Sequence, residues 1–216
     1  MIHREFKRQV IELDEKLLIT LLSNKVNVLI IGGGRAAYIK SKTFSDKNCN
    51  VQIVSKKFLK EFDGFKYRQN VNMISDEYNQ SYICDKHIIV IASDDSDVNA
   101  AIRRDCGRLY KIYIDCTKPG MGNSILPCQR STNSLYFGVN TYDSSPRTAV
   151  FISDIIKNNI EKYDDFISFT CNIRNSLPKG KRRSEIMRFI CCKDFYFFYK
   201  KKKSKIIIDM FYNNEV

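Results

Sequence analysis

Short segments rich in apolar residues occur in the first half of the chain at 26–31, 51–54, 70–74, 88–92 and 111–114. The segments 26–31 and 88–92 run without polar alternation, which is typical of strands that are buried on both faces. The stretches between them, most clearly 98–106, predict helices. Strands separated by helices indicate a parallel sheet with right-handed crossovers. We therefore expect an α/β fold, with a Rossmann-type parallel sheet over about residues 20–115.

The second half of the chain follows a different pattern. Residues 135–139 predict a strand, and residues 147–162 carry apolar side chains at helical spacing. The remaining segments predict a small, mostly helical region. We expect its helices at 166–175 and 184–192, an aromatic core segment at 195–199, and a terminal strand at 205–212.

The most informative stretch joins the first predicted strand to the first predicted helix. Gly32, Gly33, Gly34 and Ala37 fill the pattern G-x-G-x-x-G/A. In a dinucleotide site the first glycine allows the tight turn, the second lets a pyrophosphate approach the backbone, and the small last residue lets the helix pack on the sheet. A plain strand–helix turn is the alternative. The predicted contacts of the cofactor here are Gly32, Gly33, Gly34, Arg35 and Ala36.

Composition narrows the class of protein. The chain has 216 residues, of which 44% are hydrophobic, so it can form a substantial core. No apolar run approaches the roughly 20 residues of a membrane span, and the charged first residues do not resemble a secretion signal. Eight scattered cysteines and two histidines predict no metal site. We expect a cytoplasmic protein with reduced thiols and no membrane partner.

The net charge of +12 raises the possibility of nucleic-acid binding. Much of the excess lies in residues 179–183, which we interpret as a solvated loop, and in 200–203, interpreted as a hairpin tip. No helix-turn-helix, zinc-finger or RNP motif accompanies these runs. We expect no nucleic-acid partner, because an anionic small substrate accounts for basic residues equally well.

Five separated segments resemble one family in the same order: GGGRAAYIK, VQIVSKKF, IIVIASDDSDVNAAI, ILP and NTYDSSPRTA. The chain resembles the precorrin-2 dehydrogenase family, also called the siroheme synthase N-terminal domain family, over about residues 20–165. The resemblance implies an NAD-dependent enzyme that oxidises precorrin-2, a polycarboxylate tetrapyrrole, to sirohydrochlorin in siroheme or cobalamin synthesis. Some family members also insert ferrous iron. The family forms homodimers through the region after the Rossmann domain.

This resemblance and the apolar patterning together predict three parts. They are an NAD-binding Rossmann domain at 1–115, a dimerisation region at 116–163 and a helical C-terminal domain at 164–216. The amphipathic stretch 147–162 has more apolar surface than one small region covers, which also favours a homodimer.

Two further strand ends complete the predicted cofactor site. Many NAD enzymes have an acidic residue after the second strand, whereas this chain has Ser55, Lys56 and Lys57. Lysines could favour a 2′-phosphate, so NADP stays open beside NAD. Ala92, Ser93 and Asp94 follow the fourth strand and are expected to line the nicotinamide end. For Asp94 and Asp95 the alternative is a helix N-cap.

The catalytic position departs from the family pattern. Alignment without gaps places Thr117 where the family has its proposed catalytic aspartate, and the nearest acid is Asp115. Asp115 is either the catalytic carboxylate or the cap of a turn. If the aspartate is absent, the chain is a nucleotide-binding regulatory protein without activity. The resemblance implies substrate contacts at Thr117, Thr141, Ser144 and Ser145.

Overall fold

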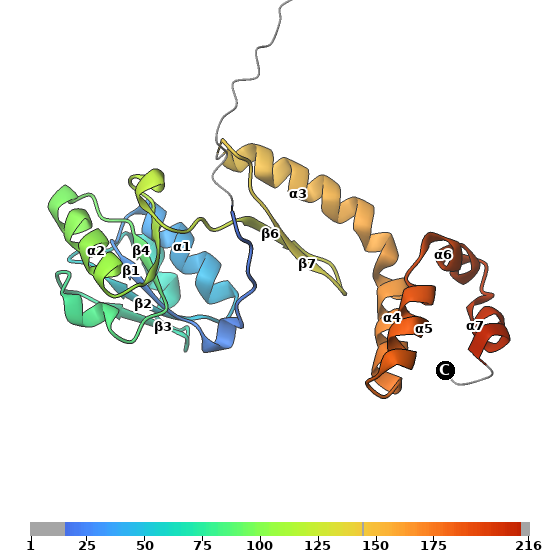
Figure 1. Cartoon of the computed structure of the whole chain (residues 1–216). Coiled ribbons are helices and arrows are strands. Elements are labelled where there is room, and N and C mark those ends of the chain that lie inside the picture. Colours follow the sequence, from blue (N-terminus) through green and yellow to red (C-terminus); the bar gives the residue numbers. More distant parts are fainter. Residues whose placement is uncertain (1–15, 144, 213–216) are drawn as a thin grey trace, which may run out of the picture. The chain divides into compact units, whose positions relative to one another are not determined.

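The computed structural model describes residues 16–143 and 145–212, and it divides into two compact units, residues 1–126 and 127–216. Each unit is described by itself below (Figure 1). Within the described residues, no helix is both long and apolar enough to cross a membrane.

The first unit is built on a five-stranded parallel sheet with the order β3-β2-β1-β4-β5. The strands are β1 (Asn27–Ile31), β2 (Asn50–Val54), β3 (Val71–Ile74), β4 (Ile88–Ile91) and β5 (Ile112–Asp115). Two helices connect them, α1 (Arg35–Asp46) and α2 (Ser96–Arg108). Short 3-10 helices complete the unit: η1 (Ser23–Lys25), η2 (Lys60–Phe65), η3 (Gln80–Ile83) and η4 (Pro119–Met121). The expected Rossmann-type sheet is confirmed.

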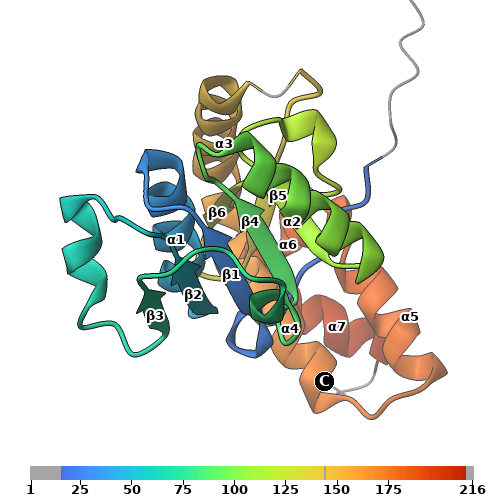
Figure 2. The ribbon, with the colours of Figure 1, turned by 90° about the vertical axis from the view of Figure 1, so that its left-hand side faces the viewer.

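Helices cover both faces of this sheet, which explains why its central strands β1 and β4 lack polar alternation (Figure 2). On one face, Ala37 and Phe44 of α1 pack with Ile30 and Val90. On the other, Ile102 of α2 packs in a cluster with the alternate side chains of the same strands. Because successive strand residues point to opposite faces, every position of β1 after Asn27 is buried.

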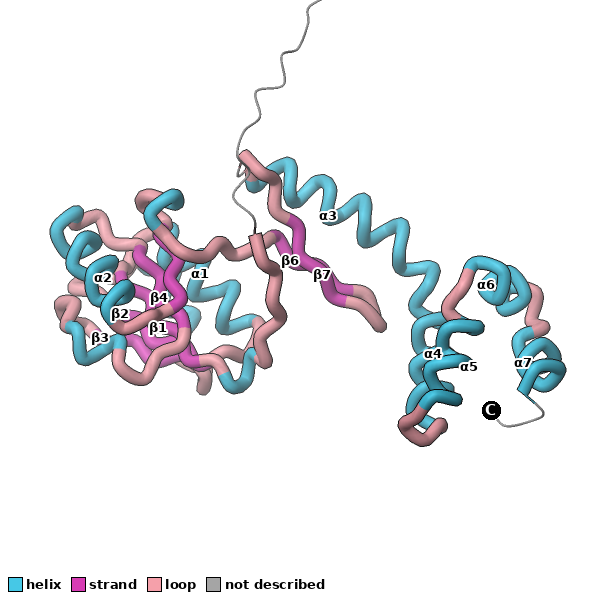
Figure 3. Tube along the Cα trace, in the orientation of Figure 1, coloured by secondary structure: helices cyan, strands magenta, loops and turns pink. Residues whose placement is uncertain are grey.

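The second unit consists of a hairpin and a series of helices (Figure 3). Strands β6 (Cys128–Ser131) and β7 (Tyr136–Val139) pair antiparallel and contact α3 (Pro146–Ile160). After η5 (Glu161–Tyr163) come α4 (Asp164–Ser176), α5 (Lys181–Ile190), α6 (Lys193–Lys200) and α7 (Ser204–Tyr212). The buried carboxylate of Asp164 ties the hairpin turn to α4, because it accepts from Thr132 Oγ1 at 2.6 Å and from the amides of Asn133 and Ser134.

The helices after α3 share a core around Ile173, Ile186, Ile190 and Phe195. The aromatic segment of α6 contributes Phe195 to this core, as expected, whereas Phe197 and Phe198 are exposed.

Three local expectations were wrong. The segment 205–212 belongs to helix α7, because Ile208 packs into the helical core and no strand lies beside it among the described residues. Lys200 ends helix α6, and residues 201–203 join α6 to α7, so the run is not the tip of a β-hairpin. The basic run 179–183 is only partly a loop, since α5 begins at Lys181.

Candidate functional site at the carboxyl edge of the sheet

One rung of the sheet fixes where the candidate residues lie. Val54, Ile31, Ile91 and Asp115 are register partners across β2, β1, β4 and β5. All four strands are parallel, so the residues that follow this rung emerge at the same edge. Ligands of open α/β sheets bind outside this carboxyl edge.

The glycine turn after β1 is held by close backbone contacts. Gly32 has a φ of 129°, and a Cβ there would lie 2.2 Å from the carbonyl oxygen of Ala92. A Cβ on Gly33 would lie 1.9 Å from the carbonyl oxygen of Lys57. The turn is therefore packed between the loops after β2 and β4, and neither position accepts a side chain without movement of the backbone.

Gly34 differs from its two neighbours, because a Cβ placed on it would meet nothing within 4 Å. It is the N-cap of α1 and supplies no capping side chain. The first amides of α1 are without intrahelical partners and carry the positive end of the helix dipole, so an anionic group can approach them over Gly34. The residues present fit the pyrophosphate of a dinucleotide.

Two cationic residues lie on the segments next to the glycine turn, Arg35 at the start of α1 and Lys56 after β2. Arg35 is exposed and lies 3.6 Å from Glu61, and Lys56 pairs with Glu77 at 2.7 Å. The ion pair with Glu77 raises the pKa of Lys56. Ser55 donates from Oγ to the carbonyl oxygen of Lys57 at 2.8 Å, which fixes the loop that packs on the glycine turn.

The loop after β4 is fixed by α2. Ala92 is buried, Ser93 accepts from the Asp95 amide, and Asp94 is exposed. The N-cap of α2 is Asp95, whose Oδ1 accepts from the amides of Asp97 and Val98. The capping alternative is thus confirmed for Asp95, and Asp94 does not serve as the cap.

Asp115 is buried at the end of β5 and accepts from several donors. Its Oδ1 accepts from the amides of Thr117 and Lys118, both at 2.8 Å, and from Thr117 Oγ1. Its Oδ2 accepts from Arg103 Nε at 2.7 Å. Burial raises the pKa of Asp115, but these hydrogen bonds outweigh it and hold the pKa below its usual range. The turn-capping geometry is confirmed, and a catalytic role stays a prediction.

The remaining predicted substrate contacts lie in the second unit. Thr141 Oγ1 accepts from the Ser145 amide at 2.7 Å, and Ser145 Oγ lies 2.7 Å from Thr148 Oγ1 just before α3. Ser144 lies outside the described residues. Across the described part of the chain, no three His, Cys, Asp or Glu side chains are placed to hold a metal ion.

Two residues of α2 at this edge were missed by the sequence analysis. Arg103 binds Asp115, and Asn99, four residues earlier, donates from Nδ2 to the carbonyl oxygen of Ser93 at 2.8 Å. Their i, i+4 spacing places both on one face of the predicted helix 98–106. The spacing could have shown that Asn99 and Arg103 share a helix face. It did not show that this face is directed toward the ends of β4 and β5.

A comparison with protein families identifies one family that matches the first unit. Residues 19–128 match the model of a family described as "Putative NAD(P)-binding". The chain belongs to this NAD(P)-binding family. The matched region contains the whole parallel sheet and every candidate residue of the first unit.

Two relatives that are similar in sequence are both named siroheme synthase. The chain is 23% identical to a siroheme synthase of Saccharophagus degradans over 132 residues, which is 61% of this chain and 29% of the relative. It is 24% identical over 119 residues to a siroheme synthase of a Psychrobacter species, covering 55% of this chain and 24% of the relative. The chain thus spans less than a third of these relatives' length.

A solved structure named SirC, precorrin-2 dehydrogenase, is similar in fold, with a TM-score of 0.66 and 20% sequence identity. The match covers 90% of this chain and all of that one. The family resemblance expected from the sequence motifs, and the α/β architecture with a helical C-terminal region, are confirmed.

Proposed function

We propose that this protein is an NAD-dependent dehydrogenase that oxidises precorrin-2 to sirohydrochlorin. The observation that carries the proposal is the shared rung: β1, which leads into the start of α1, and β5, which ends at Asp115, reach the same edge of the sheet. The names of the similar proteins, siroheme synthase and precorrin-2 dehydrogenase, support the reaction.

Residues at the ends of three strands, β1, β2 and β4, would bind the cofactor. The amides of Arg35 and Ala36 would bind the pyrophosphate over Gly34, and Lys56 and Lys57 would lie near the ribose. Ala92, Ser93 and Asp94 would line the nicotinamide end, on a loop that Asn99 holds in place. The bound cofactor supplies the acceptor of the hydride. With lysines in place of an acid after β2, NADP is the alternative cofactor.

The substrate side of the reaction needs a proton acceptor. We assign this role to Asp115, with Thr117 beside it. The family resemblance supports Thr141, Ser144 and Ser145 as further substrate contacts. A polycarboxylate tetrapyrrole suits a chain of net charge +12. The proposal places the reaction in the cytoplasm, in keeping with eight free thiols.

A homodimer forms part of the proposal. Val150, Phe151, Ile152 and Ile155 of α3 are exposed apolar side chains, and 64% of Phe151 is accessible. Such a surface is typical of a subunit interface.

One observation favours a second candidate, a nucleotide-binding regulatory protein without catalysis. Asp115 already accepts four hydrogen bonds, and its pKa lies below its usual range. A carboxylate held in this way is a weak proton acceptor. The regulatory candidate would bind the dinucleotide and leave precorrin-2 unchanged.

Absorbance of precorrin-2 incubated with the protein separates the two candidates. With NAD alone we expect conversion to sirohydrochlorin, and NADP in its place tests the choice of cofactor. Ferrous iron added as a second substrate tests insertion of the metal. Tight binding of NAD without conversion would support the regulatory candidate, and absence of nucleotide binding would contradict both.

A further inference from the structure

The last two helices of the second unit present a surface that the proposed function does not use. We call it the basic apolar surface. Its members are exposed residues of α6, α7 and the turn between them: Phe197, Phe198, Lys200, Lys201, Lys202, Lys203, Lys205, Ile206, Met210 and Phe211.

Three of the apolar members, Phe197, Ile206 and Met210, are exposed because their helices bury the opposite face. On α6, Phe195 is buried in the helical core, and Phe197 lies two positions, or about 200°, around the helix from it. On α7, Ile206 and Met210 each lie two positions from the buried Ile208, and 55% and 68% of these residues are accessible. Rotating either helix to hide these side chains would expose the core.

Along the chain, most of the charged members lie between the two apolar groups. Within the described residues, none of the five lysines forms an ion pair with a carboxylate. Lys200 lies over the ring of Tyr196 at 5.1 Å, and Lys201 over that of Phe197 at 5.9 Å. The acids of these two helices are Asp194 and Asp209.

We propose that the basic apolar surface docks on an anionic lipid bilayer. Short amphipathic helices bind bilayers by burying apolar side chains at the boundary of headgroups and acyl chains, while lysines contact anionic headgroups. Exposed aliphatic and aromatic side chains that flank five exposed lysines along the chain satisfy both requirements. The earlier expectation of no membrane partner rested on the lack of a spanning segment, which surface docking does not need.

Two other occupants fit the surface less well. A second copy of this chain, related by a two-fold axis through this surface, would set five lysines against five lysines. A nucleic acid would match the lysines and could stack on Phe197, but it would gain nothing from burying Ile206 and Met210.

Sedimentation of the full chain with vesicles tests the proposal. We expect binding to phosphatidylcholine containing about 30% phosphatidylglycerol, little binding to phosphatidylcholine alone, and weakening in about 0.5 M salt. Lys203→Glu/Lys205→Glu should reduce the affinity by about 30-fold or more. Acids at the start of α7 favour the helix, so lost binding could not be attributed to its melting.

Two further variants complete the experiment. Lys25→Glu/Lys47→Glu alters the net charge equally on exposed residues of the first unit and should leave binding unchanged. Ile206→Ser/Met210→Ser should weaken binding at low salt, because the apolar contribution is lost. Equal binding to both kinds of vesicle, or unchanged binding of the lysine variant, would overturn the proposal. So would binding only to an oligonucleotide duplex, or loss of self-association in the serine variant without any vesicle binding.

Discussion

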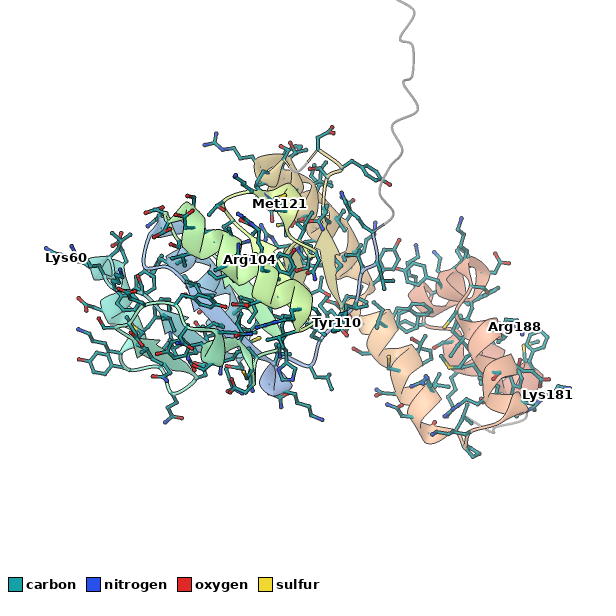
Figure 4. All side chains as sticks on the ribbon, turned by 60° about the vertical axis from the view of Figure 1, so that its left-hand side comes forward. Lys60, Arg104, Tyr110, Met121, Lys181 and Arg188 are labelled. Carbon is teal, nitrogen blue, oxygen red and sulfur yellow. The ribbon has the colours of Figure 1, made fainter. Side chains whose placement is uncertain are left out.

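Arg103 donates from Nε to Oδ2 of Asp115 at 2.7 Å, and the accessible fractions of the two side chains are 15% and 0%. The neighbouring Arg104 is exposed on the same helix (Figure 4). The ion pair joins α2 to the end of β5, and it favours the charged form of the one carboxylate that the proposed reaction uses. Substitutions that remove the ion pair therefore test whether Asp115 has a catalytic or a purely structural role.

Substitution Asp115→Asn should leave the fold and the binding of NAD intact and lower turnover by about 10²-fold or more, the usual effect of losing a general base. The rate of sirohydrochlorin formation measures the turnover. Turnover close to that of the wild type would show that Asp115 only holds the turn.

Substitution Arg103→Met should move the acid limb of the pH–rate profile to higher pH. Without the guanidinium, the pKa of Asp115 rises, and the base becomes protonated at a higher pH. Arg104→Met is the matched control and should leave the profile in place. An unchanged profile in the Arg103 variant, together with lowered stability, would assign the ion pair to structure alone.

The cofactor site depends on the open space over Gly34. Substitution Gly34→Asp places a carboxylate where the pyrophosphate would approach and should weaken NAD binding by at least about tenfold, because like charges repel at the start of α1. Calorimetric titration measures the affinity. Gly64→Asp is the control, since its Cβ also meets nothing within 4 Å. NAD affinity that is equal in both variants would contradict the assignment.

The glycine turn also contributes to stability. Gly33→Ala brings a Cβ within 1.9 Å of the Lys57 carbonyl oxygen, so the loop after β2 must move. We expect the free energy of unfolding to fall by about 1–3 kcal/mol and Tm to fall by several degrees. Gly107→Ala, the same change in α2 where nothing lies within 4 Å, should be neutral or stabilising. Equal Tm values for the two variants would show that the loop adapts without cost.

Association of the chain depends on α3 in our proposal. Sedimentation at micromolar concentration should give about twice the 25.2 kDa mass of the chain. Phe151→Asp should shift the protein to monomers, because it places a charge in the proposed interface. Tyr67→Asp, at a residue that is 92% accessible in the first unit, should not. A monomeric wild type across this range would refute the interface.

The sequence predicted the features that depend on local residue patterns and on the order of segments along the chain. Apolar segments located all five parallel strands, and the glycine spacing located the turn before α1. It did not reveal the partner of Asp115, because the contact joins a helix face to a strand end and depends on how α2 lies on the sheet. It also gave the wrong state for 205–212, since three consecutive isoleucines fit a strand and only the core around Ile208 selects the helix.

The carboxylate of Asp164 makes the second unit sensitive to acid. Hydrogen bonding by Thr132 and by the amides of the hairpin turn lowers the pKa of Asp164 in the folded chain. A lowered folded-state pKa gives stability that is present above the unfolded value of about 4 and is lost as the pH falls through the folded value. Asp164→Asn should therefore be less stable than the wild type at pH 7, and the difference should shrink below about pH 4. Denaturant unfolding of both proteins between about pH 3 and 7 measures this difference. A difference that does not change with pH would show that the contacts of Asp164 act without regard to its charge.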